Sequence, residues 1–413
     1  MAKQILIFLI LIIFSFAEIV PAQGKDSEVA IIYNKKSPYG YKIAKHYADV
    51  YKIPDKFLIG INCVTNEAVI MDYYIKHIRN PVRNAIKKRN LDVKYLVTTK
   101  GIPLKIYVKS NYCYGLQIGG GSVESWLCLL DSDNLTNCRK GAYIRNGYAK
   151  SNKPFEKNAF KFYANCPNKT EGYLSYLVSR LDAYSYKDVI AMIDRGANAY
   201  KKGDAYYILD RSPGHSDMMI QANSSLKKLN CKVMLENTRK NLTSLKDKSG
   251  KRDLPVIAYC GHGAWAEGNP FMGWKPDRGY LGGSHFKWMN GAAFYTHESF
   301  NAYSFNYKNN GCKYTRFLMG QLLGHANNQN LLADFIKDGG TVAIGRVYHP
   351  SGSVSRDRAD ESVFFSKYAE GYKFIEAAYM SIARLGFSEV VVGDPLCRIK
   401  SNPGNTTGNK KLR

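Results

Sequence analysis

The stretch Leu254–Gly263 reads LPVIAYCGHG, an apolar run that ends in Gly-His-Gly. A run of this length bounded by glycine is typical of a strand buried on both faces of a parallel sheet. A second run, Gly291–Ser299 (GAAFYTHES), ends in a hydroxyl. Parallel α/β sheets place their chemistry beyond the carboxyl ends of their strands. We therefore predict that His262 and Ser299 lie side by side at one sheet edge, the imidazole as a base and the hydroxyl as a nucleophile.

The sequence on either side alternates between strand and helix patterns, which indicates βαβ units and a parallel sheet. A helix is expected over 71–89, with a kink or break at Pro81. Further on, a helix is expected over 173–181 and a strand over 205–210. We predict an α/β fold made of two tandem parallel-sheet α/β subdomains with a Cys-containing, loop-rich insertion. The expected units are an N-terminal subdomain at 23–106, the insertion at 107–170, a C-terminal subdomain at 171–400 and a disordered tail at 401–413.

The first residues have the layout of a secretory signal. Met1–Lys3 is short and basic, Ile5–Ala17 is almost wholly apolar, and Val20–Ala22 offers small residues for cleavage. The apolar stretch is short for a membrane span, so we predict a signal peptide over 1–22. An uncleaved anchor is the alternative. No later stretch is long and apolar enough to cross a bilayer, which predicts a secreted, periplasmic or cell-surface protein.

The chain is strongly basic, with 59 Lys and Arg against 34 Asp and Glu and a formal net charge of +25. Such a charge attracts anionic partners, among them acidic envelope polymers. The lysines are spread along the whole sequence, however, a composition that more often indicates a solvated surface than a docking patch. Because no recognisable nucleic-acid-binding motif accompanies the charge, we expect no specific binding to nucleic acid.

Nine cysteines are present, and four of them fall in the predicted insertion. Export permits disulfides, so Cys113, Cys128, Cys138 and Cys166 are candidates for two bridges, whose pairing the sequence leaves open. The odd total leaves at least one thiol free, and Cys260 is the obvious buried candidate. The cysteine spacing fits no zinc motif and no His-X-X-X-His pair occurs, so we predict no metal and no cofactor.

Two resemblances add to these observations. A strand that ends in His-Gly, followed by a second strand that ends in a nucleophile, resembles the caspase-like (clan CD) peptidases, which include gingipain, legumain and clostripain. Gly393–Leu396 (GDPL) is similar to the segment that closes gingipain-type catalytic domains. Nearly the whole mature chain also resembles an uncharacterised family of exported bacterial proteins, with no established activity. That second resemblance rests on Tyr33–Pro38 (YNKKSP), Gly101–Leu104 (GIPL), Ala377–Ser381 (AAYMS) and the GDPL segment.

The gingipain resemblance implies a caspase/gingipain-like C-terminal subdomain and a role for each residue that matches. His262 would be the general base, and the backbone N–H groups of Gly263 and residue 299 would face an oxyanion. Ser299 stands where those peptidases have cysteine. A serine hydroxyl needs a well-oriented base, usually with a third group that holds the imidazole, for which Glu298 and Asp394 are candidates.

Each of these residues also has a structural interpretation. His262 would otherwise pack at a strand end, Ser299 would otherwise cap a helix or turn, and a catalytic Cys260 is a further alternative. The segment between the two runs contains Trp265 and Trp274, which would line a substrate groove together with Glu298 or merely cover the sheet edge. Two functions therefore stay open. One is a peptidase-like hydrolase, and the other is an inactive caspase-like protein that binds a peptide or an anionic envelope polymer.

Overall fold

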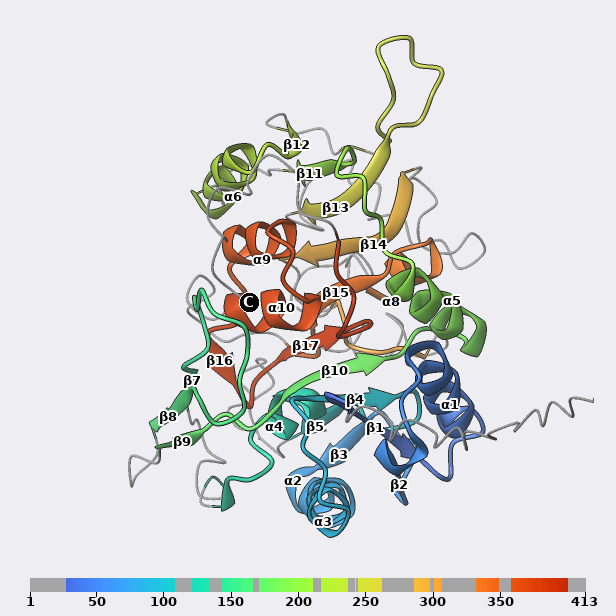
Figure 1. Cartoon of the computed structure of the whole chain (residues 1–413), viewed down its shortest axis with the longest axis vertical. Coiled ribbons are helices and arrows are strands. Elements are labelled where there is room, and N and C mark those ends of the chain that lie inside the picture. The colour runs from blue at the N-terminus through green and yellow to red at the C-terminus, as the bar shows by residue number, and fades with distance from the viewer. Residues whose placement is uncertain are drawn as a thin grey trace, which may run out of the picture.

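The structure, a computed structural model, centres on one ten-stranded sheet (Figure 1). It describes residues 27–107, 121–133, 135, 143–165, 171–210, 217–236, 242, 244–261, 286–297, 301–306, 332–348 and 358–399. The predicted signal peptide and the predicted tail lie outside these residues. From edge to edge, the strands are β12 (Lys232–Glu236), β11 (Tyr206–Asp210), β13 (Pro255–Gly261), β14 (Lys287–Thr296), β15 (Val342–Arg346), β17 (Glu389–Val392), β10 (Leu177–Leu181), β4 (Tyr95–Thr99), β1 (Val29–Asn34) and β2 (Leu58–Ile61).

The sheet consists of two parallel halves that run in opposite directions. Strands β12, β11, β13, β14 and β15 are parallel to one another, and so are β17, β10, β4, β1 and β2. The halves meet at β15 and β17, which pair antiparallel, with Arg346 opposite Glu389. The α/β class and the mainly parallel pairing are confirmed. The two expected sheets are halves of one sheet, and the carboxyl ends of the halves lie at opposite edges.

The order of strands does not follow the order of the chain. Strands β10 and β17 come from the second half of the predicted domain scheme, yet they pair in the half that holds β1, β2 and β4. The sequence over 173–181 was expected to be helical and instead contains β10, whose five residues are all buried. The C-terminal strand β17 therefore completes the N-terminal half of the sheet.

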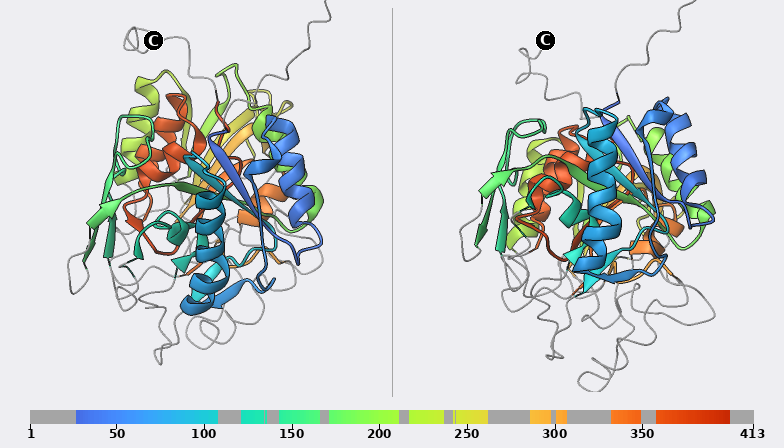
Figure 2. Two further views of the ribbon diagram at one scale, coloured as in Figure 1. Left: turned by 60° about the horizontal axis from the view of Figure 1, so that its bottom comes forward. Right: turned by 90° about the horizontal axis from the view of Figure 1, so that it is seen from below.

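Helices cover the sheet on both sides (Figure 2). Phe335 of α8 stacks on Phe294 of β14 from one side, while Glu361 of α9 lies against His297 from the other. In the expected helix over 71–89, a π-helical turn precedes Pro81, which confirms an irregularity there. The helices are α1 (Gly40–Tyr51), α2 (Met71–Tyr74), the π-helical η2 (Ile75–Arg79), α3 (Asn80–Lys88), α4 (Val123–Leu127), α5 (Tyr186–Ala197), α6 (Asp217–Lys228), α8 (Leu332–Lys337), α9 (Glu361–Ala369) and α10 (Phe374–Ser381), with the 3-10 turn η1 (Asp55–Phe57).

The described part of the predicted insertion is structured. It supplies α4, with Trp126 and Leu127 buried, and strands of two smaller sheets. None of the described helices has the length and apolar character that a membrane span needs. The smaller sheets are β16–β7–β8–β9, made of β16 (Arg384–Leu385), β7 (Tyr143–Asn146), β8 (Lys161–Asn165) and β9 (Glu171–Tyr173), and β3–β5–β6, made of β3 (Ala68–Ile70), β5 (Lys105–Tyr107) and β6 (Gly121–Ser122).

Candidate functional site

The two strands that carry the predicted catalytic pair are direct neighbours. Strands β13 and β14 pair in parallel, with Gly261 opposite Thr296, and the His297 N–H donates to the Gly261 carbonyl at 3.2 Å. Both strands therefore end at the same edge of the sheet. His262 follows Gly261 directly, and Ser299 comes three residues after Thr296. His262 and Ser299 themselves lie outside the described residues, as do the other predicted site residues Gly263, Trp265, Trp274 and Glu298.

The chain is fixed on both sides of Ser299. Asn301 Nδ2 donates to Thr296 Oγ1 at 2.9 Å, so the residues that flank 297–300 are hydrogen-bonded to each other. Asn301 Oδ1 accepts from the Arg346 N–H at 2.7 Å, and the Ala302 N–H donates to the Arg346 carbonyl at 3.0 Å. Both residues of the Thr296–Asn301 pair are buried. The stretch with Ser299 therefore spans two points that are held together at the end of β14 and β15.

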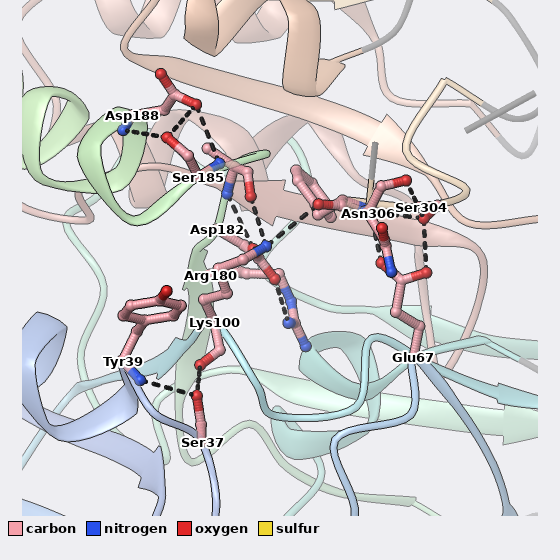
Figure 3. A network of polar contacts seen from close by, with 12 residues as sticks. Ser37, Tyr39, Glu67, Lys100, Arg180, Asp182, Ser185, Asp188, Ser304 and Asn306 are labelled. Carbon is pink, nitrogen blue, oxygen red and sulfur yellow. Dashed lines mark hydrogen bonds and ion pairs between the residues drawn. The ribbon is translucent and has the colours of Figure 1, made fainter. Parts of the chain in front are cut away.

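The segment 301–306 is hydrogen-bonded to charged side chains from the N-terminal part of the chain (Figure 3). Lys100 Nζ, at the end of β4, donates to the Phe305 carbonyl at 3.2 Å and to Asp182 Oδ1 at 3.0 Å. The Glu67 carboxylate accepts from Ser304 Oγ at 2.6 Å and from the Phe305 N–H at 2.7 Å. Charged side chains of the N-terminal half thus anchor the residues that follow the predicted nucleophile.

Two of the quoted motifs meet in this N-terminal half. Asn34 of the YNKKSP motif donates to the Gly101 carbonyl at 2.9 Å, and Gly101 opens the GIPL motif. Gly101 has a φ of 99°, a conformation that favours glycine. The buried guanidinium of Arg180 donates to the carbonyls of Ile102 and Pro103 at 3.0 and 2.7 Å. These bonds fix the loop that follows β4 against Asn34 of β1 and Arg180 of β10.

Asp394 of the GDPL segment contacts helix α1. It follows β17, whose carboxyl end lies at the edge opposite to that of β13. Asp394 is fully buried and accepts from Tyr47 Oη at 2.7 Å and from Tyr51 Oη. Burial raises the pKa of Asp394 to about 6, against the effect of these two hydrogen bonds. The side chain of Asp394 therefore serves the packing of α1, which speaks against a role in orienting a catalytic imidazole; His262 itself lies outside the described residues.

A second acidic residue, which sequence reasoning missed, lies at the correct edge. Asp210 ends β11, directly opposite Gly261, and is buried. Its Oδ2 accepts from Tyr259 Oη at 3.0 Å and from the Leu242 N–H at 3.2 Å. Burial raises the pKa of Asp210 to about 6, while these two bonds act in the opposite direction. The sequence offered one indication of this residue: Asp210 is the last residue of the predicted strand 205–210, where a parallel sheet places its functional side chains.

A compact group of buried side chains lies on the α9 side of the same edge. Cys260, His297 and Glu361 place a sulfur, a ring nitrogen and a carboxylate oxygen within 4.8 Å of one another. We call these three residues the Cys-His-Glu cluster. His297 Nε2 lies 3.4 Å from Glu361 Oε1. Burial holds the pKa of His297 below its ordinary value; Arg358 and Arg346 act in the same direction and Glu361 against it, so the neutral imidazole is favoured.

Arg346 supports this cluster from β15. Its guanidinium is fully buried, donates to the His297 carbonyl at 3.2 Å and to Tyr295 Oη at 2.8 Å, and pairs with Glu389 Oε1 at 3.3 Å. A buried cation is costly unless its donors are satisfied and its charge is paired. Arg346 therefore fixes the end of β14 while Glu389 compensates its charge.

The disulfide prediction needs correction at Cys128. Cys128 is a free, fully buried thiol whose sulfur lies 3.1 Å from Tyr379 Oη of α10. It packs in the core because α4, which precedes it, lies against β10 and β17. Two bridges among the four cysteines are therefore not formed. Cys113, Cys138 and Cys166 lie outside the described residues.

Comparison with known proteins adds no identity. No model of a protein family matches the chain, and no curated protein matches it either. Any function must therefore be argued from the two strand ends, the clamped stretch between Thr296 and Asn301, and the groups around them.

Proposed function

We propose that this chain is an exported, peptidase-like hydrolase of the caspase/gingipain type, with His262 as general base and Ser299 as nucleophile. The observation that carries the proposal is the hydrogen bond between Asn301 and Thr296 at the end of the strand that neighbours β13. It ties the chain down immediately before and after the stretch that contains Ser299. A nucleophile that lies between two fixed points of the chain loses less conformational entropy when it is ordered for the reaction.

The chemistry follows from the residue types at that edge. The imidazole of His262 would take the proton from Ser299 Oγ as the oxygen attacks a carbonyl carbon, and would then deliver it to the leaving amine. The N–H groups of Gly263 and residue 299 would stabilise the oxyanion of the tetrahedral intermediate. Water would then hydrolyse the acyl-enzyme in a second, analogous cycle.

Covalent labelling with a fluorophosphonate probe tests this function. The wild-type protein should be labelled, and labelling should disappear in Ser299→Ala and fall strongly in His262→Ala. Ser224→Ala is the matched control, because Ser224 is an exposed serine of α6 that bonds only to the Ile220 carbonyl among the described residues. Absence of labelling in the folded wild-type protein across neutral and mildly alkaline pH would exclude the hydrolase, as would labelling that persists in Ser299→Ala.

The net charge of +25 favours one alternative, an inactive caspase-like protein that binds an anionic envelope polymer. Alginate is a suitable probe because it carries only carboxylate charge. This alternative predicts alginate binding that weakens steeply with added salt, in a protein that the fluorophosphonate does not label. Fluorophosphonate labelling of Ser299 would instead support the hydrolase over the inactive binding protein.

A further inference from the structure

The Cys-His-Glu cluster brings together three kinds of metal ligand from three separate parts of the chain. Cys260 is the penultimate residue of β13, His297 follows β14, and Glu361 is the first residue of α9. All three are buried, with His297 8% and Glu361 1% exposed and Cys260 fully enclosed. Their ligand atoms lie within 4.8 Å of one another, and His297 Nε2 is 3.4 Å from Glu361 Oε1. Ligands about 2.0–2.3 Å from a tetrahedral zinc ion are roughly 3.3–3.8 Å apart.

Glu361 supplies the independent reason to place a cation here. Among the contacts of the described residues, neither oxygen of its carboxylate accepts a hydrogen bond of good geometry, and the 3.4 Å contact with His297 Nε2 lies within the cluster itself. The cap of α9 is provided by Asp360, whose Oδ1 accepts from the Ser362 N–H at 3.0 Å, so Glu361 is not needed for capping. A buried carboxylate without hydrogen bonds is strongly unfavourable, whereas coordination of a cation satisfies it.

The donor set selects the class of ion. A thiolate, an imidazole and a carboxylate suit zinc and related transition metals, whereas calcium and magnesium prefer oxygen ligands alone. The thiolate and the carboxylate together carry two negative charges, which match a divalent cation. The positive charge of nearby Arg346 is paired with Glu389. Its N–H groups donate to the His297 carbonyl and to Tyr295 Oη.

We propose that Cys260, His297 and Glu361 form a zinc site beneath the start of α9. Three protein ligands leave a fourth position for water or another donor. The backbone of His297 is held by two bonds, from its N–H to Gly261 and from Arg346 to its carbonyl, so two of the three ligands sit on a fixed pair of strand ends. The site does not depend on the proposed hydrolase chemistry.

Metal content is the first test. The full chain is produced in zinc-supplemented medium, so that the ion is available during folding, and is purified without chelator. Elemental analysis should find about one zinc per chain in the wild type. Zinc should fall to background in Cys260→Ser and in Glu361→Gln, while Cys397→Ser retains it. Cys397 is the matched control because it is also a buried free thiol, bonded to Tyr368 and outside the cluster.

Cobalt substitution identifies the ligand directly. Protein produced with Co²⁺ in place of zinc should show thiolate-to-cobalt charge-transfer absorption that is absent in Cys260→Ser and present in Cys397→Ser. Circular dichroism confirms that each variant is folded. A folded wild type that carries neither zinc nor the cobalt band overturns the proposal, and so does a band that survives in Cys260→Ser. Ser299→Ala should keep its zinc, which separates this test from that of the hydrolase.

Discussion

Asn301 Nδ2 donates to Thr296 Oγ1 at 2.9 Å, and both side chains are buried at the end of β14. The same amide accepts from the Arg346 N–H at 2.7 Å through its oxygen. The Asn301 side chain therefore joins the segment after Ser299 to the ends of two neighbouring strands, β14 and β15. Because the stretch with Ser299 lies between these two residues, the amide of Asn301 is expected to control both the stability of this edge and the position of the nucleophile.

Replacing Asn301 by Ala should therefore be costly. It leaves the Arg346 N–H and the Thr296 hydroxyl buried without this partner, and each such loss costs about 1–3 kcal/mol. We expect urea denaturation to show a loss of about 2–4 kcal/mol. Thr296→Val, which removes only the hydroxyl, should cost less than half as much. An equal effect of the two substitutions would show that the bond to Arg346 contributes nothing.

The buried pair of Arg180 and Glu124 offers a second test. Their side chains are completely buried, with Nη2 of Arg180 2.7 Å from Oε1 of Glu124. Removing one partner of a buried ion pair typically costs about 3–5 kcal/mol, because the other charge remains without compensation. Glu124→Leu should destabilise the protein by up to that amount, because Asp182, 3.1 Å from Arg180 Nη1, still compensates part of the charge. Arg180→Leu combined with Glu124→Leu should cost clearly less than the sum of the single substitutions, as measured in a double-mutant cycle.

Arg180 also shows why part of the fold was predictable and part was not. The alternation of apolar runs was enough for the α/β class, since it depends on local patterns. The interval 173–181 was expected to be helical, because Leu174, Leu177, Val178 and Leu181 recur at helical spacing. In the structure, Arg180 is buried in a central strand, which is possible only because Glu124 and Asp182 compensate its charge. That compensation depends on contacts distant in sequence, which no local pattern contains.

The candidate site divides in the same way. The strands that lead to His262 and Ser299 were expected to end at the same edge, because neighbouring parallel strands do so. These strands, β13 and β14, pair as direct neighbours, which supports that expectation. The reversal of direction between β15 and β17 is not encoded locally, and it moves Asp394 to the opposite edge. The Cys-His-Glu cluster could not be predicted from local sequence patterns either. Glu361 belongs to a helix that reaches β13 and β14 only through tertiary packing.

The burial of Cys128 predicts its reactivity. Burial raises the pKa of this thiol to about 12, and only the thiolate reacts with disulfide reagents. In the native protein, Cys128 should not react with a thiol-specific reagent, and after unfolding without reductant it should react fully. Mass spectrometry of the labelled peptide gives the readout. Failure to label after unfolding would mean that Cys128 is in a disulfide.

Asp394 predicts how stability changes with pH. Burial raises its pKa to about 6 in the folded protein, from 3.8 as the ordinary value, so between these values the folded state holds a proton that the unfolded state has lost. Stability must therefore decrease as pH rises from about 4 to about 6, by about 3 kcal/mol for this group, and then level off. Asp394→Asn should remove this part of the slope.

Tyr51→Phe should have the opposite effect. The Tyr51 hydroxyl stabilises the charged carboxylate of Asp394, so its loss should raise the pKa of Asp394 further and extend the decrease in stability to higher pH. Urea denaturation at a series of pH values measures the stability of both variants. If the free energy of unfolding changes with pH in Asp394→Asn as it does in the wild type, the Asp394 carboxyl group is ionised alike in the folded and unfolded chain.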